Sequence, residues 1–352
     1  MKNALFAPIL AAIFLSGCVI AATPITHTGR SMPGSAWNDR DDDREPRPSG
    51  VYPSGLRPRP ATWGLVAPGV SFNAVHFVDF NSGWVVGGLD HETKKAAIRH
   101  TRNAGSTWAI QDKGVNDLRA VDFLSPNIGY VGGDNGVIFR TENAGGSWKL
   151  LDTGTSEPIV DIDFGNLTDG YFLTRNAGLF QTTDAGATWI KRNAIPDARD
   201  LDYLPNGIVY VSAGSGFYRF ESGVLTKLEF PSDKPGDFAF VDPARRLGWA
   251  TGAYGVLYKT DDAGLSWEQV RRLTTPDEYV ARYNANALAF ATATTGMLLT
   301  ERSAYLTLDG GDTWERADSR LTFIKCGKHF QLFDESHGWA FGDGTSLYRY
   351  GN

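Results

Sequence analysis

The chain has 352 residues and a formal net charge of −6, and 40 of its residues are glycine. This composition is typical of a protein built from many short β-strands, and its mild acidity disfavours a nucleic-acid binder, which would concentrate positive charge. Two cysteines, Cys18 and Cys326, are too few for a disulfide framework, and the histidines lack the spacing of a metal site, so we expect no metal and no cofactor.

Residues 1–17 have the layout of a bacterial secretory signal. Lys2 is followed by an apolar stretch over residues 4–15, which is too short to span a bilayer. The sequence Leu-Ser-Gly-Cys at residues 15–18 resembles the lipobox of bacterial lipoproteins. This resemblance implies that Cys18 is lipidated and becomes the first residue of the mature protein.

The residues after Cys18 predict a cellular location and a disordered linker. Because Val19 is not the aspartate associated with retention at the inner membrane, we expect an outer-membrane lipoprotein that faces the periplasm. An ordinary signal cut after Ala21 or Ala22, which leaves a soluble periplasmic or secreted protein, is the alternative. Residues 18–61 are rich in proline and charge and have little to bury, so we expect an extended, disordered tether.

The rest of the chain contains five copies of the motif Thr-x-Asp/Asn-x-Gly-x-Ser/Thr-Trp. A short Asp or Asn side chain can bond backbone N–H groups within a turn, and Gly tolerates φ > 0, so each motif predicts a hairpin turn. The Trp should open the next strand and bury its ring between sheets. The Asp/Asn, Gly and Trp positions are Asn103, Gly105 and Trp108; Asn143, Gly145 and Trp148; Asp184, Gly186 and Trp189; Asp262, Gly264 and Trp267; and Asp309, Gly311 and Trp314.

A second pattern precedes each motif: a β-rich run and then Gly with an aromatic residue, as in Gly83-Trp84. Each repeat therefore predicts four short strands, with the motif turn joining the third to the fourth. Consecutive motif tryptophans lie 40, 41, 78 and 47 positions apart, so the long gap hides a repeat, residues 201–228, that lacks the motif. Four strands every 40 residues or so indicate a propeller blade.

The repeats predict an all-β, seven-bladed β-propeller over residues 62–352, with six or eight blades as the alternatives. Residues 329–350 provide only three strands, and residues 62–66 resemble the fourth strands of the other blades. We therefore expect this N-terminal strand to complete the last blade and close the ring, which removes open sheet edges. The six complete blades should begin near Val75, Val121, Val160, Leu201, Phe238 and Leu288.

The motif resembles the Asp-box, or bacterial neuraminidase repeat, and the Gly-Trp-Val-x-Gly run before it resembles the photosystem II stability and assembly factor family. The resemblance covers residues 63–350 and implies a propeller. Asp-boxes occur in sialidases, xyloglucan-degrading enzymes, receptors and assembly factors, so the motif implies fold more strongly than activity.

The enzymes of this group are disfavoured by what the sequence lacks. A sialidase should have a Phe/Tyr-Arg-Ile-Pro segment ahead of the first motif. The most similar segment, Arg-Pro-Arg-Pro at residues 57–60, does not match. A glycosidase needs two facing carboxylates, and no sequence feature selects a pair. We therefore expect no enzymatic activity, with glycan binding or glycoside hydrolysis as the alternative.

A binding surface is expected on the face opposite the motif turns, which loops between second and third strands and between blades should form. The residues expected there include Asp134, Arg175, Tyr254, Arg302 and Asp343. The crossing at residues 271–286 is longer than the others, and Arg and Tyr are typical interface anchors. A solvated insertion is the alternative. The candidate anchors in this crossing are Arg271, Arg272, Tyr279, Arg282 and Tyr283.

These features together predict a non-enzymatic, lipid-anchored periplasmic propeller. It should bind an envelope protein and assist the assembly or operation of a membrane complex, and the assembly-factor resemblance motivates this expectation. The client of that family is not implied for this chain, since its strongly basic surface segment is missing here.

Overall fold

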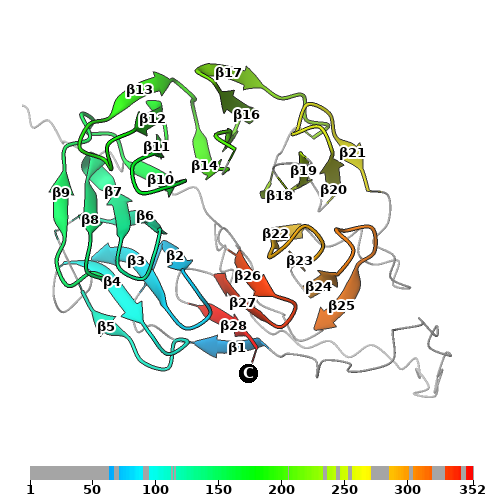
Figure 1. Ribbon diagram of the computed structural model, residues 1–352, viewed down its shortest axis with the longest axis horizontal. Coiled ribbons are helices and arrows are strands. Elements are labelled where there is room, and N and C mark those ends of the chain that lie inside the picture. The colour runs from blue at the N-terminus through cyan, green and yellow to red at the C-terminus, as the bar shows by residue number, and fades with distance from the viewer. Residues whose placement is uncertain are drawn as a thin grey trace, which may run out of the picture. The chain divides into compact units, whose positions relative to one another are not determined.

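The computed structural model describes residues 63–66, 71–89, 95–111, 114, 116–204, 206–232, 236–242, 246–252, 256–270, 285–300, 304–318, 330–341 and 346–351. They form seven four-stranded antiparallel sheets arranged in a ring (Figure 1). The one helical segment among these residues is a single 3-10 turn, Asp134–Gly136. The prediction of an all-β, seven-bladed propeller is therefore confirmed.

The blades follow one another along the chain. Blade 1 is β2 (Ala74–Phe77), β3 (Gly83–Leu89), β4 (Ala96–Thr101) and β5 (Ala109–Ile110). Blade 2 is β6 (Leu118–Phe123), β7 (Gly129–Gly133), β8 (Ile138–Thr141) and β9 (Lys149–Leu151). Blade 3 is β10 (Ile159–Phe164), β11 (Gly170–Thr174), β12 (Gly178–Thr182) and β13 (Ile190–Asn193). Blade 4 is β14 (Ala198–Tyr203), β15 (Val209–Ala213), β16 (Gly216–Glu221) and β17 (Val224–Lys227), which confirms the repeat without a motif.

The remaining blades complete the ring. Blade 5 is β18 (Phe238–Asp242), β19 (Leu247–Thr251), β20 (Leu257–Thr260) and β21 (Glu268–Gln269). Blade 6 is β22 (Ala285–Phe290), β23 (Gly296–Thr300), β24 (Ala304–Thr307) and β25 (Glu315–Asp318). Blade 7 is β26 (Phe330–Asp334), β27 (His337–Phe341), β28 (Leu347–Tyr350) and β1 (Trp63–Val66).

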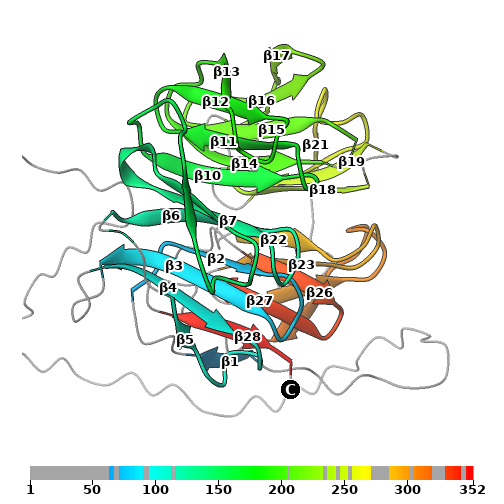
Figure 2. The same ribbon diagram turned by 60° about the vertical axis from the view of Figure 1, so that its left-hand side comes forward.

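Blade 7 joins the two ends of the propeller, as predicted. Strand β1 pairs antiparallel with β28, from Trp63 opposite Tyr350 to Val66 opposite Leu347. Both views show β1 beside β28 (Figures 1 and 2). The ring of Trp63 also packs against Tyr350, with 5.1 Å between ring centroids, so side-chain contacts support the pairing.

Aromatic stacking between blades explains the Gly-aromatic pairs of the sequence. In blade 2 the ring of Phe123 lies so close to Gly129 that a Cβ atom there would come within 2.3 Å of it. The same ring stacks on Trp84 of blade 1, with centroids 3.5 Å apart, and meets the motif residue Trp148 edge-on. The glycine makes room for the phenylalanine, and the aromatic residue after each glycine reaches the neighbouring blade.

The motif tryptophans pack edge-on against these phenylalanines but are less buried than predicted. Trp314 is fully buried, whereas the other four motif tryptophans are half-buried. All five tryptophans directly precede the outermost strand of their blade, and only Trp314 is fully covered there.

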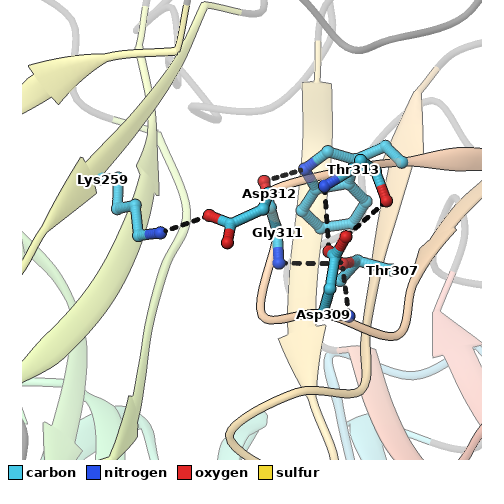
Figure 3. A network of polar contacts seen from close by, with 7 residues as sticks. Lys259, Thr307, Asp309, Gly311, Asp312 and Thr313 are labelled. Atoms are coloured by element: carbon cyan, nitrogen blue, oxygen red, sulfur yellow. Dashed lines mark hydrogen bonds and ion pairs between the residues drawn. The ribbon is translucent and has the colours of Figure 1, made fainter.

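Each motif forms the predicted hairpin turn through one repeated hydrogen-bond network, shown for blade 6 in Figure 3. The Thr307 hydroxyl donates to Asp309 Oδ1 (2.8 Å) and accepts the N–H of Gly311 (2.8 Å). Asp309 in turn accepts the N–H and the hydroxyl of Thr313. Gly311 has φ of +92°, a conformation that favours glycine.

The motif turns also fasten neighbouring blades, a role that the sequence did not predict. A long side chain from one blade donates to the carbonyl of the residue before the motif glycine in the next blade. The pairs are Arg349 to Ala104 (3.1 Å), Gln111 to Ala144 (2.7 Å), Tyr130 to Ala185 (3.2 Å) and Tyr210 to Ala263 (2.8 Å). Between blades 5 and 6 the Lys259 ammonium binds the Asp312 carboxylate instead (2.8 Å; Figure 3).

Replacing Thr307 by valine should lower the free energy of unfolding by about 1–3 kcal/mol, because the Gly311 N–H loses its acceptor at a buried position. Urea denaturation measures the change. The matched control is Thr313→Val at an exposed position of the same turn, which should cost under about 1 kcal/mol. Equal losses for the two variants would contradict the role assigned to Thr307.

Candidate functional site

The two faces of the ring differ in their loops. Turns between first and second strands and between third and fourth strands lie on one face, with the motifs. Turns between second and third strands and the connections between blades lie on the other, which we call the loop face. The first strand of each blade borders the centre of the ring (Figure 1).

Two of the predicted partner-binding residues belong to described parts of the loop face. Asp134 begins the turn between β7 and β8. Its carboxylate accepts hydrogen bonds from Arg119 Nε at 2.6 Å and from a second guanidinium nitrogen of Arg119 at 3.2 Å. The bond to Asp134 raises the pKa of Arg119. A bidentate pair of this kind holds both side chains in place at the start of the innermost strand β6.

Arg175 lies between β11 and β12, in the next blade. Its guanidinium is 4.0 Å from the Asp197 carboxylate, which also binds Arg199 at 2.9 Å. Asp197 and Arg199 are exposed, and Arg175 is half-buried. Asp134 and Arg175 therefore belong to two separate charged groups, one on blade 2 and one that joins blades 3 and 4.

The other predicted binding residues lie outside the described residues and stay predictions. They are Arg271, Arg272, Tyr279, Arg282 and Tyr283 of the long crossing, together with Tyr254, Arg302 and Asp343. Cys18, Cys326 and the signal and tether segments also lie outside the described residues.

A group of carboxylates on the innermost strands was missed by the sequence analysis. We call them the inner-rim carboxylates: Asp122 of β6, Asp161 and Asp163 of β10, Asp200 and Asp202 of β14, and Asp237, which precedes β18. A signal for them was present, because aspartate followed by Phe or Tyr recurs at residues 122–123, 163–164 and 202–203, in step with the repeat.

Four of the inner-rim carboxylates join adjacent blades. Each accepts a backbone N–H from the innermost strand of the next blade, which has no further strand on its inner side to pair with. The bonds are Phe164 to Asp122 (2.9 Å), Leu201 to Asp161 (2.8 Å), Tyr203 to Asp163 (2.7 Å) and Leu288 to Asp237 (2.8 Å). Gln331 performs the same task between blades 7 and 1 by accepting the N–H of Phe77 (2.7 Å).

Asp202 occupies the repeat position of Asp122 and Asp163 without making their bond. It is half-buried, and no hydrogen bond to its carboxylate is found among the described residues. Burial, together with the charges of Asp163 and Asp200, raises its pKa well above the usual value. Asp202 is therefore the inner-rim carboxylate with the least compensation for its charge.

Burial raises the pKa of four other inner-rim carboxylates too. The pKa of Asp163 rises to about 6, mainly through burial, with the charge of Asp200 adding to the effect. The pKa values of Asp122, Asp161 and Asp237 are also raised by burial first and by neighbouring carboxylates second. The inner rim thus gathers carboxyl groups whose neutral form is favoured by partial burial and by like charge nearby.

His76 of β2 extends this cluster into blade 1. Its Nδ1 atom lies 3.5 Å from Asp122 Oδ1. Burial lowers the pKa of His76 to about 4, while burial raises that of Asp122. Both shifts disfavour the charged forms of the two groups.

Other features of the described residues limit the possible sites. None of the described segments is a helix long and apolar enough to cross a membrane. No group of three or more His, Cys, Asp or Glu side chains in the described part of the chain is arranged to hold a metal ion. A shallow apolar hollow between blades 4 and 5 has no room for even a water molecule, so it is no ligand pocket.

Known structures share this fold. The propeller resembles the photosystem II assembly factor YCF48: a structure of YCF48 bound to D1 peptide is 21% identical with a TM-score of 0.68, covering 84% of this chain and 98% of that one. YCF48 from Cyanidioschyzon merolae is 19% identical with a TM-score of 0.64, covering 82% and 98%. The GH74 enzyme of Niastella koreensis is 14% identical with a TM-score of 0.56, covering 77% of this chain and 50% of that enzyme. No protein-family model and no curated protein matches the sequence.

Proposed function

We propose that the chain is a non-enzymatic, lipid-anchored periplasmic propeller that binds an envelope protein through its loop face and assists the assembly or operation of a membrane complex. The observation that carries the non-enzymatic part of this proposal is what the inner-rim carboxylates bind. In a glycosidase, a shielded carboxylic acid and a second carboxylate face the substrate. Here Asp122, Asp161, Asp163 and Asp237 face backbone N–H groups of the next blade.

The loop face supports protein binding because it presents charged side chains at fixed positions. Arg119 and Asp134 hold each other by two hydrogen bonds, and the partly exposed Arg175 lies one blade further on. Similarity to YCF48, which has been seen with a bound peptide, supports a peptide or protein ligand for this propeller. The proposals of a lipid anchor and of a periplasmic location rest on the sequence around Cys18.

Glycan binding, with or without cleavage, is the second candidate, and similarity to a GH74 enzyme favours it at the level of fold. A glycan array combined with a reducing-sugar assay separates the two functions. We expect neither binding nor release of reducing ends. Turnover of any polysaccharide would overturn the non-enzymatic proposal.

Replacing Arg271, Arg272, Arg282 and Tyr283 together by alanine should abolish capture of the client, because Arg and Tyr supply most of the affinity in typical interfaces. A crosslinked pull-down from the native envelope measures capture, and a thermal melt close to that of the wild type shows that the fold is intact. The matched control replaces Lys149, Lys191 and Lys227, which lie on outermost strands, and should leave capture unchanged. Undiminished capture by the first variant would exclude this loop.

A further inference from the structure

We propose that the outer edge of blades 1 to 3 lies against an anionic lipid surface. Its aliphatic side chains enter the interfacial region of the bilayer, and its cationic side chains bind the headgroup phosphates. This inference rests on the proposed membrane attachment and deepens it, because it says how the anchored ring lies on the membrane. We call the surface the aliphatic-basic edge: Ile110, Leu150 and Ile190 with Lys149, Lys191 and Arg192.

The aliphatic residues of this edge belong to the outermost strands of three consecutive blades. Ile110 lies in β5, Leu150 in β9 and Ile190 in β13, and more than half of each residue's surface is exposed. Single exposed aliphatic residues are ordinary on protein surfaces. These three instead follow one another along the outside of the ring (Figure 1).

The motif turns link these three strands in order. Gln111, which follows β5, donates to the carbonyl of Ala144 in the motif turn of blade 2 (2.7 Å). In blade 3 the motif turn leads into β13, and a Cβ atom at its Gly186 would come within 2.7 Å of the Leu151 side chain of β9. The edge is therefore held in a fixed arrangement by packing between blades.

The fold does not require aliphatic residues at these positions. Ile110 and Leu150 lie two residues after the motif tryptophans, where blade 3 has Lys191, β21 has Gln269 and β25 has Arg316. In all five blades this residue pairs with the residue two positions before the motif threonine. The structural position is the same, and only some blades fill it with an apolar side chain.

The charges on the same three strands are all positive, although the chain as a whole is acidic. Strand β9 contributes Lys149, and β13 contributes Lys191 and Arg192, while β5, β9 and β13 contain neither Asp nor Glu. The outermost strands of blades 5 and 6 carry acidic residues, among them Glu268 and Glu315. The outer edge of the ring thus differs in charge from one part to another.

Contacts within blade 3 position two of the cations. The Lys191 ammonium lies 5.9 Å from the centre of the Phe180 ring, and Arg192 Nε donates to Gln181 Oε1 (2.8 Å). Both residues nevertheless remain exposed, as does Lys149. Their charged groups are therefore accessible to a ligand outside the protein.

The acidic side chains of the adjoining turns bind groups of the protein itself. Glu142 in the motif turn of blade 2 is paired with Arg140 at 2.6 Å, and Asp152, which follows β9, accepts a backbone N–H. Asp184 in the motif turn of blade 3 accepts the N–H and the hydroxyl of Thr188. Among the described residues no ion pair joins a carboxylate to a cation of the edge.

The composition of the edge favours lipid over a protein partner. Protein interfaces are anchored mainly by Trp, Tyr and Arg, and they are depleted in Lys. Aliphatic side chains beside Lys and Arg are typical of interfacial membrane contacts, in which buried apolar area and attraction to anionic lipids add together. The edge is also the convex outside of the ring (Figure 1), which suits a deformable lipid surface.

The chain enters the propeller one blade away from this edge. Strand β1 is the outermost strand of blade 7, and Arg349 of that blade donates to Ala104 in the motif turn directly before β5 (3.1 Å). The residues that would carry a lipid anchor at Cys18 precede β1. An anchor raises the effective concentration of the edge at the membrane, so a modest affinity is enough to orient the ring.

The first test places a polarity-sensitive fluorophore on the edge. The full chain with Cys18→Ser and Cys326→Ser has no acyl group and can be labelled at one new cysteine. With vesicles of phosphatidylcholine and phosphatidylglycerol, a label at Leu150→Cys should brighten and shift to the blue. The matched control is Gln269→Cys, at the same position of blade 5, which should change little.

The second test removes the positive charges. Changing Lys149, Lys191 and Arg192 together to glutamine should weaken binding to the same vesicles at least about 10-fold, because each basic residue near an anionic surface contributes about fivefold. The control removes three exposed cations from other parts of the ring and should cost less than about threefold, since their attraction is screened. The control positions are Lys95, Arg246 and Arg316.

Four results would overturn the proposal: no spectral change at position 150, an equal change at position 269, an equal change with phosphatidylcholine alone, or equal losses for the two charge variants. A change at position 150 that depends on protein concentration without vesicles would also overturn it, in favour of a contact between copies. If a charge variant does not fold, the pair of labels decides. Because the vesicles contain no client and the chain has no acyl group, failure here leaves the proposed client and anchor untouched.

Discussion

Replacing Trp84 by alanine is expected to lower the free energy of unfolding by about 3–5 kcal/mol, the largest effect of any single change considered. The indole is fully buried and is stacked between two rings. Its ring centroid lies 4.0 Å from that of His100 of its own blade and 3.5 Å from that of Phe123 of blade 2. Its removal would leave a cavity at the boundary between blades 1 and 2, and the paired strands on both sides leave little freedom for collapse. Urea denaturation measures the loss.

The matched control for Trp84 is Ile110→Ala on the outermost strand of the same blade, where 66% of the side chain is exposed. That change should cost about 0.5 kcal/mol or less. A loss for Trp84→Ala of the same size as for the control would show that stacking between blades does not hold the ring together.

Adding one methyl group in Gly129→Ala is expected to cost about 1–3 kcal/mol, the second large effect. The new Cβ would lie 2.3 Å from the ring of Phe123. The phenylalanine cannot easily move away, because Trp84 stacks on its ring and Trp148 meets it edge-on. Thermal or urea denaturation of the purified variant measures the change.

Gly64→Ala provides the comparison for Gly129, because a Cβ atom at this position of β1 would meet nothing within 4 Å. This variant should unfold at the wild-type urea concentration, within about 0.5 kcal/mol. If Gly129→Ala were equally harmless, the Gly-aromatic pairs would need an explanation other than room for the phenylalanine.

The repeats explain why so much of the architecture was predictable. The motif turn, the Gly-aromatic pair and the strand of residues 62–66 each recur in sequence because each performs one task in every blade. Blade 4 was predictable without its motif, because the gap of 78 positions between motif tryptophans leaves room for one more repeat. In the structure a tight turn with Ser222 and Gly223 at positive φ replaces the motif turn between β16 and β17.

The contacts between blades were not predictable in the same way. Gln111, Tyr130, Tyr210 and Arg349 fasten different motif turns, so no single residue type marks this role in the sequence. The inner-rim carboxylates do recur, but an aspartate on a strand suggests a polar surface until the next blade's backbone is in place. Of the candidate binding residues, only Asp134 and Arg175 belong to the described part, and they lie in separate charged groups.

The most direct test of the proposed function is a crosslinked pull-down of the tagged full-length protein from its native envelope, compared with a Cys18→Ala variant that cannot be lipidated. We expect one membrane protein complex to be enriched with the anchored form and to be lost or reduced with the variant. Enrichment of no protein by either form, together with retention of a glycan, would contradict a protein-binding role and favour a carbohydrate ligand.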